Sequence, residues 1–255
     1  MKGKNVMKNK ISGKIVALLL TLIIVATSGM PLYAKETGDK ANSFRYENGQ
    51  SIAKAVPFST LSPNAWKKID GKYYSGDGSV IEGAVAKGID VSHHQGTVDW
   101  KKAKEDGVEF AIIRCGFGMN QTKQDDAQWF NNVKGCEENN IPYGVYLYSY
   151  ADTVKKAQSE AEHVLRLIKG HTLAYPVYYD IEEKAVLNKL TAEQLGKIAA
   201  TFVNKVKAEG YQTGIYSNKS NFETFLTDSQ FSQWNKWVAQ YNSAACTYKG
   251  TYQIW

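Results

Sequence analysis

Two carboxylates, Asp180 and Glu182, are separated by one residue at the end of the apolar, β-rich run from Tyr175 to Ile181. On an extended strand, residues i and i+2 point to the same side, about 6.6 Å apart, so both side chains are expected to face one space and Glu183 to face away. Two carboxylates in a partly desolvated site move each other's pKa values apart, so that one keeps a proton while the other is ionised. Acid-catalysed cleavage of a glycosidic bond needs such a pair. The alternative is an acidic strand end that meets solvent.

The elements that must position this pair are predicted from the hydrophobic pattern. From Lys87 onward, short apolar runs alternate with longer amphipathic ones, which is typical of βα units. The helix expected over residues 191–209 opens with the capping-box residues Thr191 and Gln194 and ends before Gly210. The other helices are expected at 100–106, 126–139 and 153–169, and the strands at 88–91, 110–114, 143–148, 175–181, 214–217, 237–240 and 251–255.

Parallel strands wrapped by helices over this length predict an α/β barrel. Such barrels carry their chemistry at the carboxyl ends of the strands. Asp90, Asp180 and Glu182 all fall at or near such ends, so we expect the chemistry at that side of the sheet.

Residues 1–34 have the pattern of a secretory signal peptide. Five lysines precede the apolar run from Ile15 to Ala26, and a small-residue exit follows at Leu32 to Ala34. The apolar core is too short for a comfortable membrane span. We therefore expect a protein that is exported and extracellular or associated with the cell wall, and that contacts the membrane only through this segment before cleavage. An uncleaved membrane anchor is the alternative.

The charge balance argues against a nucleic-acid partner. The five lysines of the signal segment account for most of the excess of 31 basic over 25 acidic residues, so 26 basic residues remain against the same 25. Nucleic-acid binding calls for a basic surface. Three cysteines are too few and too oddly numbered for a disulfide framework. The remaining length can form a single core-containing domain, which we expect to be monomeric.

Residues 35–86 are expected to form a linker that contains one β-hairpin. The stretch is polar and holds two of the five prolines, Pro57 and Pro63. Its segment from Trp66 to Gly78 resembles a single aromatic hairpin repeat of cell-wall-binding modules. One repeat cannot bury its own face, so a plain hairpin packed on the following domain is the favoured interpretation.

A series of motifs occurs in the order found in family 25 of the glycoside hydrolases, and the chain from about Lys87 to Trp255 resembles that family. The motifs are Gly88 to Gly96, Val98 to Trp100, Phe110 to Arg114, Gly144 to Tyr146, Tyr178 to Glu182, Gly214 to Asn218 and Trp237 to Tyr241. The resemblance implies a lysozyme, an N-acetylmuramidase that cleaves the β-1,4 bond between N-acetylmuramic acid and N-acetylglucosamine in bacterial peptidoglycan with retention. It also implies an irregular (β/α)5(β)3 barrel and no cofactor.

The resemblance assigns roles to three acidic residues. Glu182 matches the general acid that protonates the leaving oxygen and later activates water. Asp180 matches its partner, which acts either as a nucleophile or by orienting the acetamido group of the substrate. Asp90 matches the first-strand aspartate that helps to set the charge state of the site. Weaker candidates for sugar contacts, each of which could instead serve barrel packing, are Tyr146, Tyr148, Tyr216, Gln240 and Tyr241.

The chain departs from the family pattern at two places. Family members continue into a final strand with a Val-Asp pair, whereas this chain stops at Trp255. We therefore expect a fragment of a longer reading frame with the domain boundaries 1–34, 35–86 and 87–255. The alternative is a truncated product whose barrel lacks its last strand and leaves an unpaired edge. After the second strand, Arg114 to Gly118 replaces a common family signature and follows a subgroup of these enzymes.

Three other functions are weighed against a muramidase. A metal-dependent polysaccharide deacetylase could use His93 and His94, but neighbouring residues on an extended run point to opposite sides and no further histidine motif follows, so we expect no metal. Cys115 lacks a histidine in a motif context that would activate it as a nucleophile and is expected to be a small buried hydrophobe. A wall-binding barrel without turnover is the remaining alternative, and the presence of both carboxylates favours the enzyme.

Overall fold

The computed structural model describes residues 46–47, 50–51, 66–240 and 246–255 of the 255-residue chain. All of them belong to the unit Gly38–Trp255. The predicted signal peptide and most of the predicted linker lie outside these residues. Within the linker, β1 (Tyr46–Glu47) pairs antiparallel with β2 (Gln50–Ser51). None of the helices in the described ranges is long and apolar enough to cross a membrane.

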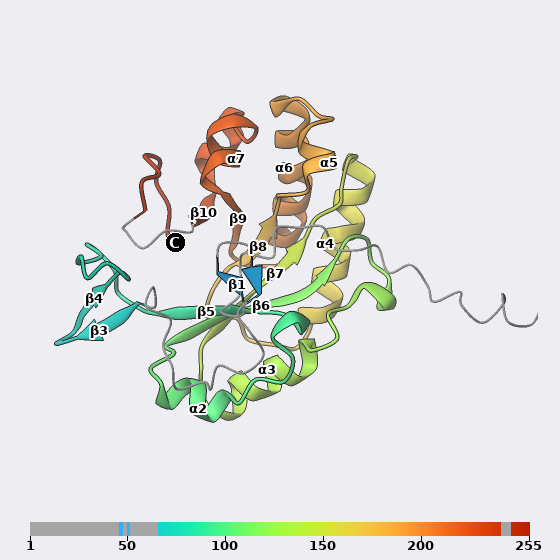
Figure 1. The fold of residues 1–255 in the computed structure, drawn as a ribbon. Coiled ribbons are helices and arrows are strands. Elements are labelled where there is room, and N and C mark those ends of the chain that lie inside the picture. Colours follow the sequence, from blue (N-terminus) through green and yellow to red (C-terminus); the bar gives the residue numbers. More distant parts are fainter. Residues whose placement is uncertain (1–45, 48–49, 52–65, 241–245) are drawn as a thin grey trace, which may run out of the picture. The chain divides into compact units, whose positions relative to one another are not determined.

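Six parallel strands form the main sheet of the described residues, and this sheet curls into a half-barrel (Figure 1). Neighbours in sequence are neighbours in the sheet, as expected for successive βα units. The predicted strands at 88–91 and 143–148 agree with the structure residue for residue. The strands are β5 (Gly88–Val91), β6 (Phe110–Phe117), β7 (Tyr143–Tyr148), β8 (Val177–Asp180), β9 (Thr213–Asn218) and β10 (Asn235–Ala239).

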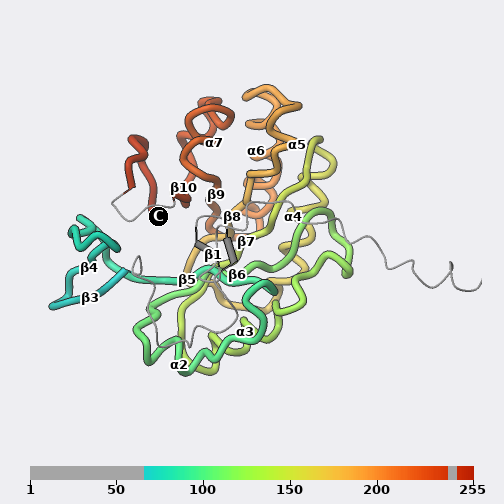
Figure 2. Tube along the Cα trace, in the orientation of Figure 1, coloured from blue at the N-terminus to red at the C-terminus, as the bar shows by residue number. Residues whose placement is uncertain are grey.

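Helices connect the strands, and the chain path is followed in Figure 2. The capping box predicted at Thr191 is confirmed, since its side chain accepts from the Gln194 amide and the Gln194 side chain accepts from the Thr191 amide. The α-helices are α2 (Trp100–Glu105), α3 (Trp129–Glu138), α4 (Val154–Ile168), α5 (Lys184–Leu187), α6 (Ala192–Ala208) and α7 (Lys219–Thr224), and the 3-10 helices are η2 (His93–Gln95), η3 (Thr122–Gln124) and η4 (Ser229–Gln233). The sequence patterns do not predict α5, α7 or the 3-10 helices.

The two faces of the sheet have different surroundings. On the outer face, strand residues such as Ile113, Leu147 and Tyr179 pack against helix residues such as Val164 and Phe202 in one large core. The inner face carries a smaller, mainly aromatic cluster without helix residues, made up of Phe110, Ile112, Tyr178, Tyr216, Trp237 and Ala239. Because successive side chains alternate between faces, β6, β8, β9 and β10 contribute buried residues to both clusters.

The predicted hairpin is present and is bonded to the residue that precedes β6. Strand β3 (Lys67–Ile69) pairs antiparallel with β4 (Lys72–Tyr74) through Asp70 and Gly71, which both have positive φ, as a two-residue hairpin turn requires. The hydroxyl of Tyr73 donates to Glu109 at 2.6 Å, and Lys68 pairs with the same carboxylate at 2.5 Å. Burial alone would raise the pKa of Glu109, but these bonds and the one from the Lys87 amide lower it to about 2.

The last described residues differ from the strand expected at 251–255. They form a single parallel bridge between Ile254 and Trp237. The amides of Gln253 and Ile254 both donate to the carbonyl of Lys236, and Val238 donates to the carbonyl of Ile254. One carbonyl thus receives two donors in place of the regular ladder of a strand.

Candidate active site

The paired carboxylates lie at the carboxyl end of β8. Asp180 is the last residue of the strand and is buried, and Glu182 follows it with partial exposure. Between them, the side chain of Ile181 packs in the outer core, and its amide donates to the carbonyl of Tyr216 at 3.0 Å. The chain therefore stays extended beside β9 for one residue beyond β8, which leaves Asp180 and Glu182 on the side opposite to Ile181.

Tyr148 lies beside the acid pair. It is level with Asp180 in the register of β7 and β8. Burial, followed by the nearby charges of Asp180, Glu182 and Glu183, raises the pKa of this phenol well above its usual range. The three carboxylates thus lie near one buried tyrosine. The hydroxyl of Tyr148 donates to Glu183 at 3.2 Å.

The expectation that Glu183 faces away from the site is therefore wrong. Glu183 caps α5, where its side chain accepts from the amide of Ala185, and it also accepts the hydroxyl of Tyr148. The strand alternation on which the expectation rested does not extend to Glu183, because this residue is the N-cap of α5 and the backbone turns into the helix at Lys184.

Asp90 approaches the same site from the end of β5. Its carboxyl group is surrounded by protein, although the residue keeps some exposure, and burial raises its pKa to about 7. Tyr146 on β7 lies near both Asp90 and Asp180. Burial raises the pKa of Tyr146 well above its usual range. The charge of Arg114 lowers this pKa, whereas the charges of Asp90, Asp180 and Asp126 raise it. Asp90 near the end of β5 and Asp180 at the end of β8 thus both lie near one tyrosine of β7.

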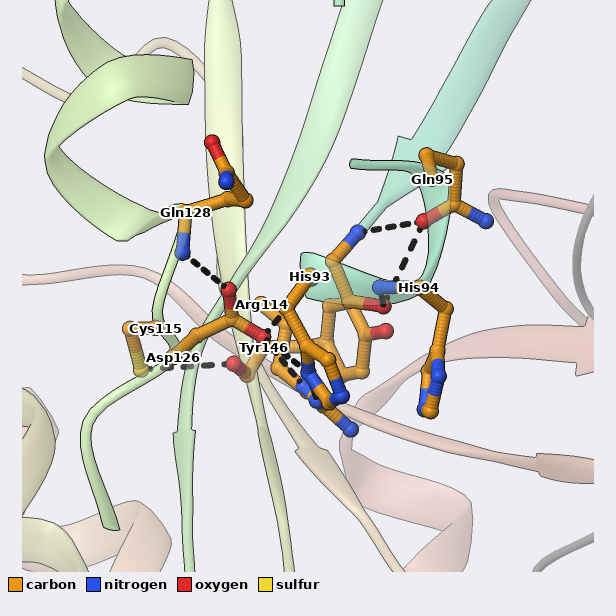
Figure 3. A network of polar contacts seen from close by, with 9 residues as sticks. His93, His94, Gln95, Arg114, Cys115, Asp126, Gln128 and Tyr146 are labelled. Atoms are coloured by element: carbon orange, nitrogen blue, oxygen red, sulfur yellow. Dashed lines mark hydrogen bonds and ion pairs between the residues drawn. The ribbon is translucent and has the colours of Figure 1, made fainter. Parts of the chain in front are cut away.

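A buried ion pair stands next to Tyr146, at the carboxyl ends of β5 and β6 (Figure 3). Arg114 donates its Nε to Asp126 at 2.8 Å, and both side chains are almost fully buried. Asp126 also accepts from the amides of His93 and Gln128 at 3.0 and 2.8 Å. Burial would raise the pKa of Asp126, but bonds from His93 and the charge of Arg114 lower it to about 2, so it is ionised.

His93 belongs to this network through its ring. Its Nδ1 lies 3.3 Å from Asp126 and contacts the guanidinium of Arg114, and its ring lies 4.0 Å from that of His94. In residues 66–240 and 246–255, no three His, Cys, Asp or Glu side chains are grouped to hold a metal ion. His93 is thus part of the polar network around Asp126 and Arg114.

The aromatic candidates differ in their surroundings. Tyr216 is buried and packs on Trp237 at 4.3 Å, and Tyr146 meets the same indole edge-on at 5.7 Å. Tyr178 lies 5.6 Å from Trp237 on another side. Trp237 thus contacts three tyrosine rings within the inner-face cluster. The partly exposed Tyr146 remains a candidate for sugar contact, whereas the surroundings of Tyr216 are those of a packing residue.

The remaining candidate residues lie at the end of β10. The side-chain oxygen of Gln240 accepts from the amide of Thr247 at 2.8 Å, and its carbonyl accepts from the indole of Trp255 at 3.1 Å. Gln240 thus ties together the chain on both sides of residues 241–245. Tyr241 lies outside the described residues.

A cavity of about 330 Å³, lined by residues 171–175 and 210–212, lies at the amino ends of β8 and β9, opposite to Asp180.

Cys115 is fully buried, and its thiol donates to the carbonyl of Tyr146. Burial raises the pKa of this thiol. A thiol in this state is no nucleophile, as we had expected.

The sequence reasoning missed Asp126 and gave Arg114 no role in the site. Arg114 could have been found, because it ends the predicted second strand, where parallel barrels carry functional groups. Asp126 had been assigned to the start of a helix. The helix begins instead at Trp129, which leaves Asp126 in a loop. This loop folds back on β6, where the backbone amide of Asp126 donates a hydrogen bond to the carbonyl of Cys115.

A curled parallel sheet with helices on its outer face and three carboxyl groups at its carboxyl edge defines an α/β barrel-like fold. The model of the glycosyl hydrolases family 25 matches residues 89–255. The chain belongs to this family.

Proteins similar to this chain include two lysozymes and an autolysin. The chain is 28% identical over 155 residues to an autolytic lysozyme of Clostridium acetobutylicum, which covers 61% of this chain and 45% of that protein. It is 33% identical, with a TM-score of 0.61, to the modular autolysin LytC of Streptococcus pneumoniae, over 70% of this chain and 44% of the other. A lysozyme of Streptomyces coelicolor shares the fold at 23% identity, with a TM-score of 0.58, over 68% of this chain and 82% of the other. The chain thus spans less than half of the first two relatives.

Proposed function

We propose that this protein is a peptidoglycan hydrolase, a lysozyme that cleaves the β-1,4 bond between N-acetylmuramic acid and N-acetylglucosamine with retention. The observation that carries the proposal is the convergence of Asp180 and Glu182 on Tyr148 at the carboxyl edge of a family 25 sheet. The names of the relatives support it, and LytC has been solved in complex with a synthetic peptidoglycan ligand.

In the proposed mechanism, Glu182 protonates the glycosidic oxygen as the bond to the sugar breaks, and then removes a proton from the attacking water. Its partial exposure allows access to both groups. Asp180 stabilises the positive charge that develops on the sugar, either by direct attack or through the acetamido group of the substrate. A protonated Asp90 would keep a further negative charge away from the pair near neutral pH.

The wider organisation is part of the same proposal. We infer a signal peptide over residues 1–34, a linker with the hairpin over 35–86 and a hydrolase domain over 87–255 with a (β/α)5(β)3 barrel. The protein would then act as a monomer, outside the cell or at the wall. The resemblance of 66–78 to wall-binding repeats and the names of the autolytic relatives support this location.

The test is product analysis with purified peptidoglycan. Borohydride reduction followed by mass spectrometry should show reduced N-acetylmuramic acid at the new ends, and NMR of the first product should show the β-anomer. Glu182→Gln should lower the rate by about 10² to 10⁴, while Glu193→Gln, an exposed carboxyl group on α6, should not. Binding to peptidoglycan without new ends would instead support the non-catalytic barrel, and reduced N-acetylglucosamine would overturn the bond assignment.

A further inference from the structure

Glu160 is a fully buried carboxyl group on α4, on the outer face of the sheet and away from the proposed substrate. Its Oε2 accepts from the hydroxyls of Tyr179 and Ser149 at 2.6 and 2.8 Å. Its Oε1 accepts from the amide of Tyr150 at 2.9 Å. Three donors around one buried carboxyl group form a satisfied polar network, which specifies a single arrangement of the groups that it joins.

Both hydroxyl donors belong to the chain around Asp180. Tyr179 immediately precedes Asp180 on β8, and the amide of Ser149 donates to the carbonyl of Asp180 at 2.9 Å. Because neighbouring strand residues point to opposite faces, holding the Tyr179 side chain on the outer face limits the rotation of Asp180 on the inner face. The hydroxyl oxygens of Ser149 and Tyr179 also lie 2.8 Å apart, so the three side chains form a closed triangle behind the acid pair.

The same network extends toward Tyr148. The ring of Tyr150, whose amide is bound by Glu160, lies 5.0 Å from the ring of Tyr148. Tyr148 in turn reaches Glu183 and lies near Asp180 and Glu182. Glu160 is therefore connected to the acid pair through β8 and through the end of β7.

An apolar side chain on α4 would fill this space at lower cost, since burying a carboxyl group is expensive even when it is hydrogen-bonded. Burial raises the pKa of Glu160 to about 7 in spite of the three donors. We propose that Glu160 is a positioning residue for the reaction, which fixes the end of β8 so that Asp180 holds its place relative to Glu182. This inference rests on the proposed function of the acid pair.

The test uses the full chain and two variants that keep side-chain volume. Glu160→Gln replaces one acceptor by a donor, and Tyr179→Phe removes a hydroxyl while keeping the ring stacked on Phe202 at 3.9 Å. We expect kcat on soluble glycan fragments to fall about tenfold or more with KM changed less than about twofold, because small displacements of reacting groups cost rate. Leu195→Ala, a buried change on α6 that is absent from this network, controls for lost stability and should keep kcat.

A readout without turnover accompanies the kinetics. In wild-type protein and in both variants, the carboxyl carbons of Asp180 and Glu182 are titrated by NMR, and we expect their apparent pKa values to change in both variants but not in Leu195→Ala. Lower melting temperatures with wild-type kcat and wild-type titrations would overturn the inference. If Glu160→Gln does not fold, Tyr179→Phe decides alone. Full activity of Glu182→Gln would instead refute the proposed function, while the titrations would still report on positioning.

Discussion

Asp125 and Asp126 are neighbours in the chain, but their carboxylates contact residues on opposite sides of the sheet. Asp125 accepts from His163 at 2.7 Å and from Arg166 at 2.5 and 3.0 Å, both on α4. Asp126 binds Arg114 and His93 beside the candidate active site. The loop after β6 is thus anchored to the helix layer by one residue and to the site by the next.

The two aspartates should differ in their contribution to stability. Asp126→Asn leaves the charge of Arg114 buried without its counterion, and we expect the free energy of unfolding to fall by about 3–5 kcal/mol. Asp125→Asn should cost only about 1 kcal/mol, since the side chain of Arg166 is 35% exposed and solvent screens the pair. Urea denaturation at pH 7 measures both. Equal losses in the two variants would contradict this assignment.

The pKa of Asp90 predicts a stability change with pH. Because the folded-state pKa of about 7 lies above the ordinary value of 3.8, the folded protein keeps a proton that the unfolded chain releases, and the stability from this group falls as the pH rises from about 4 to about 7. Asp90→Asn removes this loss. The free energy of unfolding of Asp90→Asn minus that of wild type should therefore be larger at pH 8 than at pH 4 by on the order of 1–3 kcal/mol, a range that allows for the partial exposure of Asp90.

The matched control is Asp106→Asn, at the exposed end of α2. Its difference from wild type should be the same at both pH values. A constant difference for Asp90→Asn as well, measured by denaturation across this range, would refute the link between this carboxyl group and stability.

Tyr148→Phe and Glu183→Gln should have similar effects, because they alter the two partners of one hydrogen bond. We expect each to lower the rate of peptidoglycan cleavage by about three- to tenfold, which corresponds to one hydrogen bond of ordinary strength. Both effects should stay well below that of Glu182→Gln. Additive losses in the double variant, measured by release of reducing ends, would show that the two residues act independently.

Glu109 should control the attachment of the hairpin. Glu109→Ala removes the acceptor shared by Lys68, Tyr73 and the Lys87 amide, so we expect a lower melting temperature and faster proteolysis within residues 66–74. Glu105→Ala, at an exposed position on α2, is the control. Unchanged proteolysis in Glu109→Ala would mean that other contacts hold the hairpin.

The signal segment predicts that the exported protein begins at Lys35. The five lysines, the apolar core and the small residue Ala34 lead us to expect cleavage after Ala34. Amino-terminal sequencing of protein from the culture medium and the wall fraction checks this. Intact protein in the membrane fraction would establish an anchor.

Patterns within short stretches of sequence were enough for much of the fold. Alternation and apolar runs gave β5 and β7 with correct bounds, and the capping residue Thr191 marked the start of α6. The pairing of Asp180 with Glu182 could also be predicted, because the two residues are separated by a single strand residue. These features depend on backbone geometry over a few residues, and local sequence specifies that geometry.

Contacts between distant segments were decided only by the tertiary structure. The curl of the sheet brings Asp90 and Asp180 to one tyrosine, and the folded-back loop places Asp126 on Arg114. Neither follows from periodicity, which reports the face of an element but not its partners. Glu183 was misjudged for a related reason: α5 is a single turn, too short for a helical period to show in the sequence, and it redirects the side chain toward Tyr148.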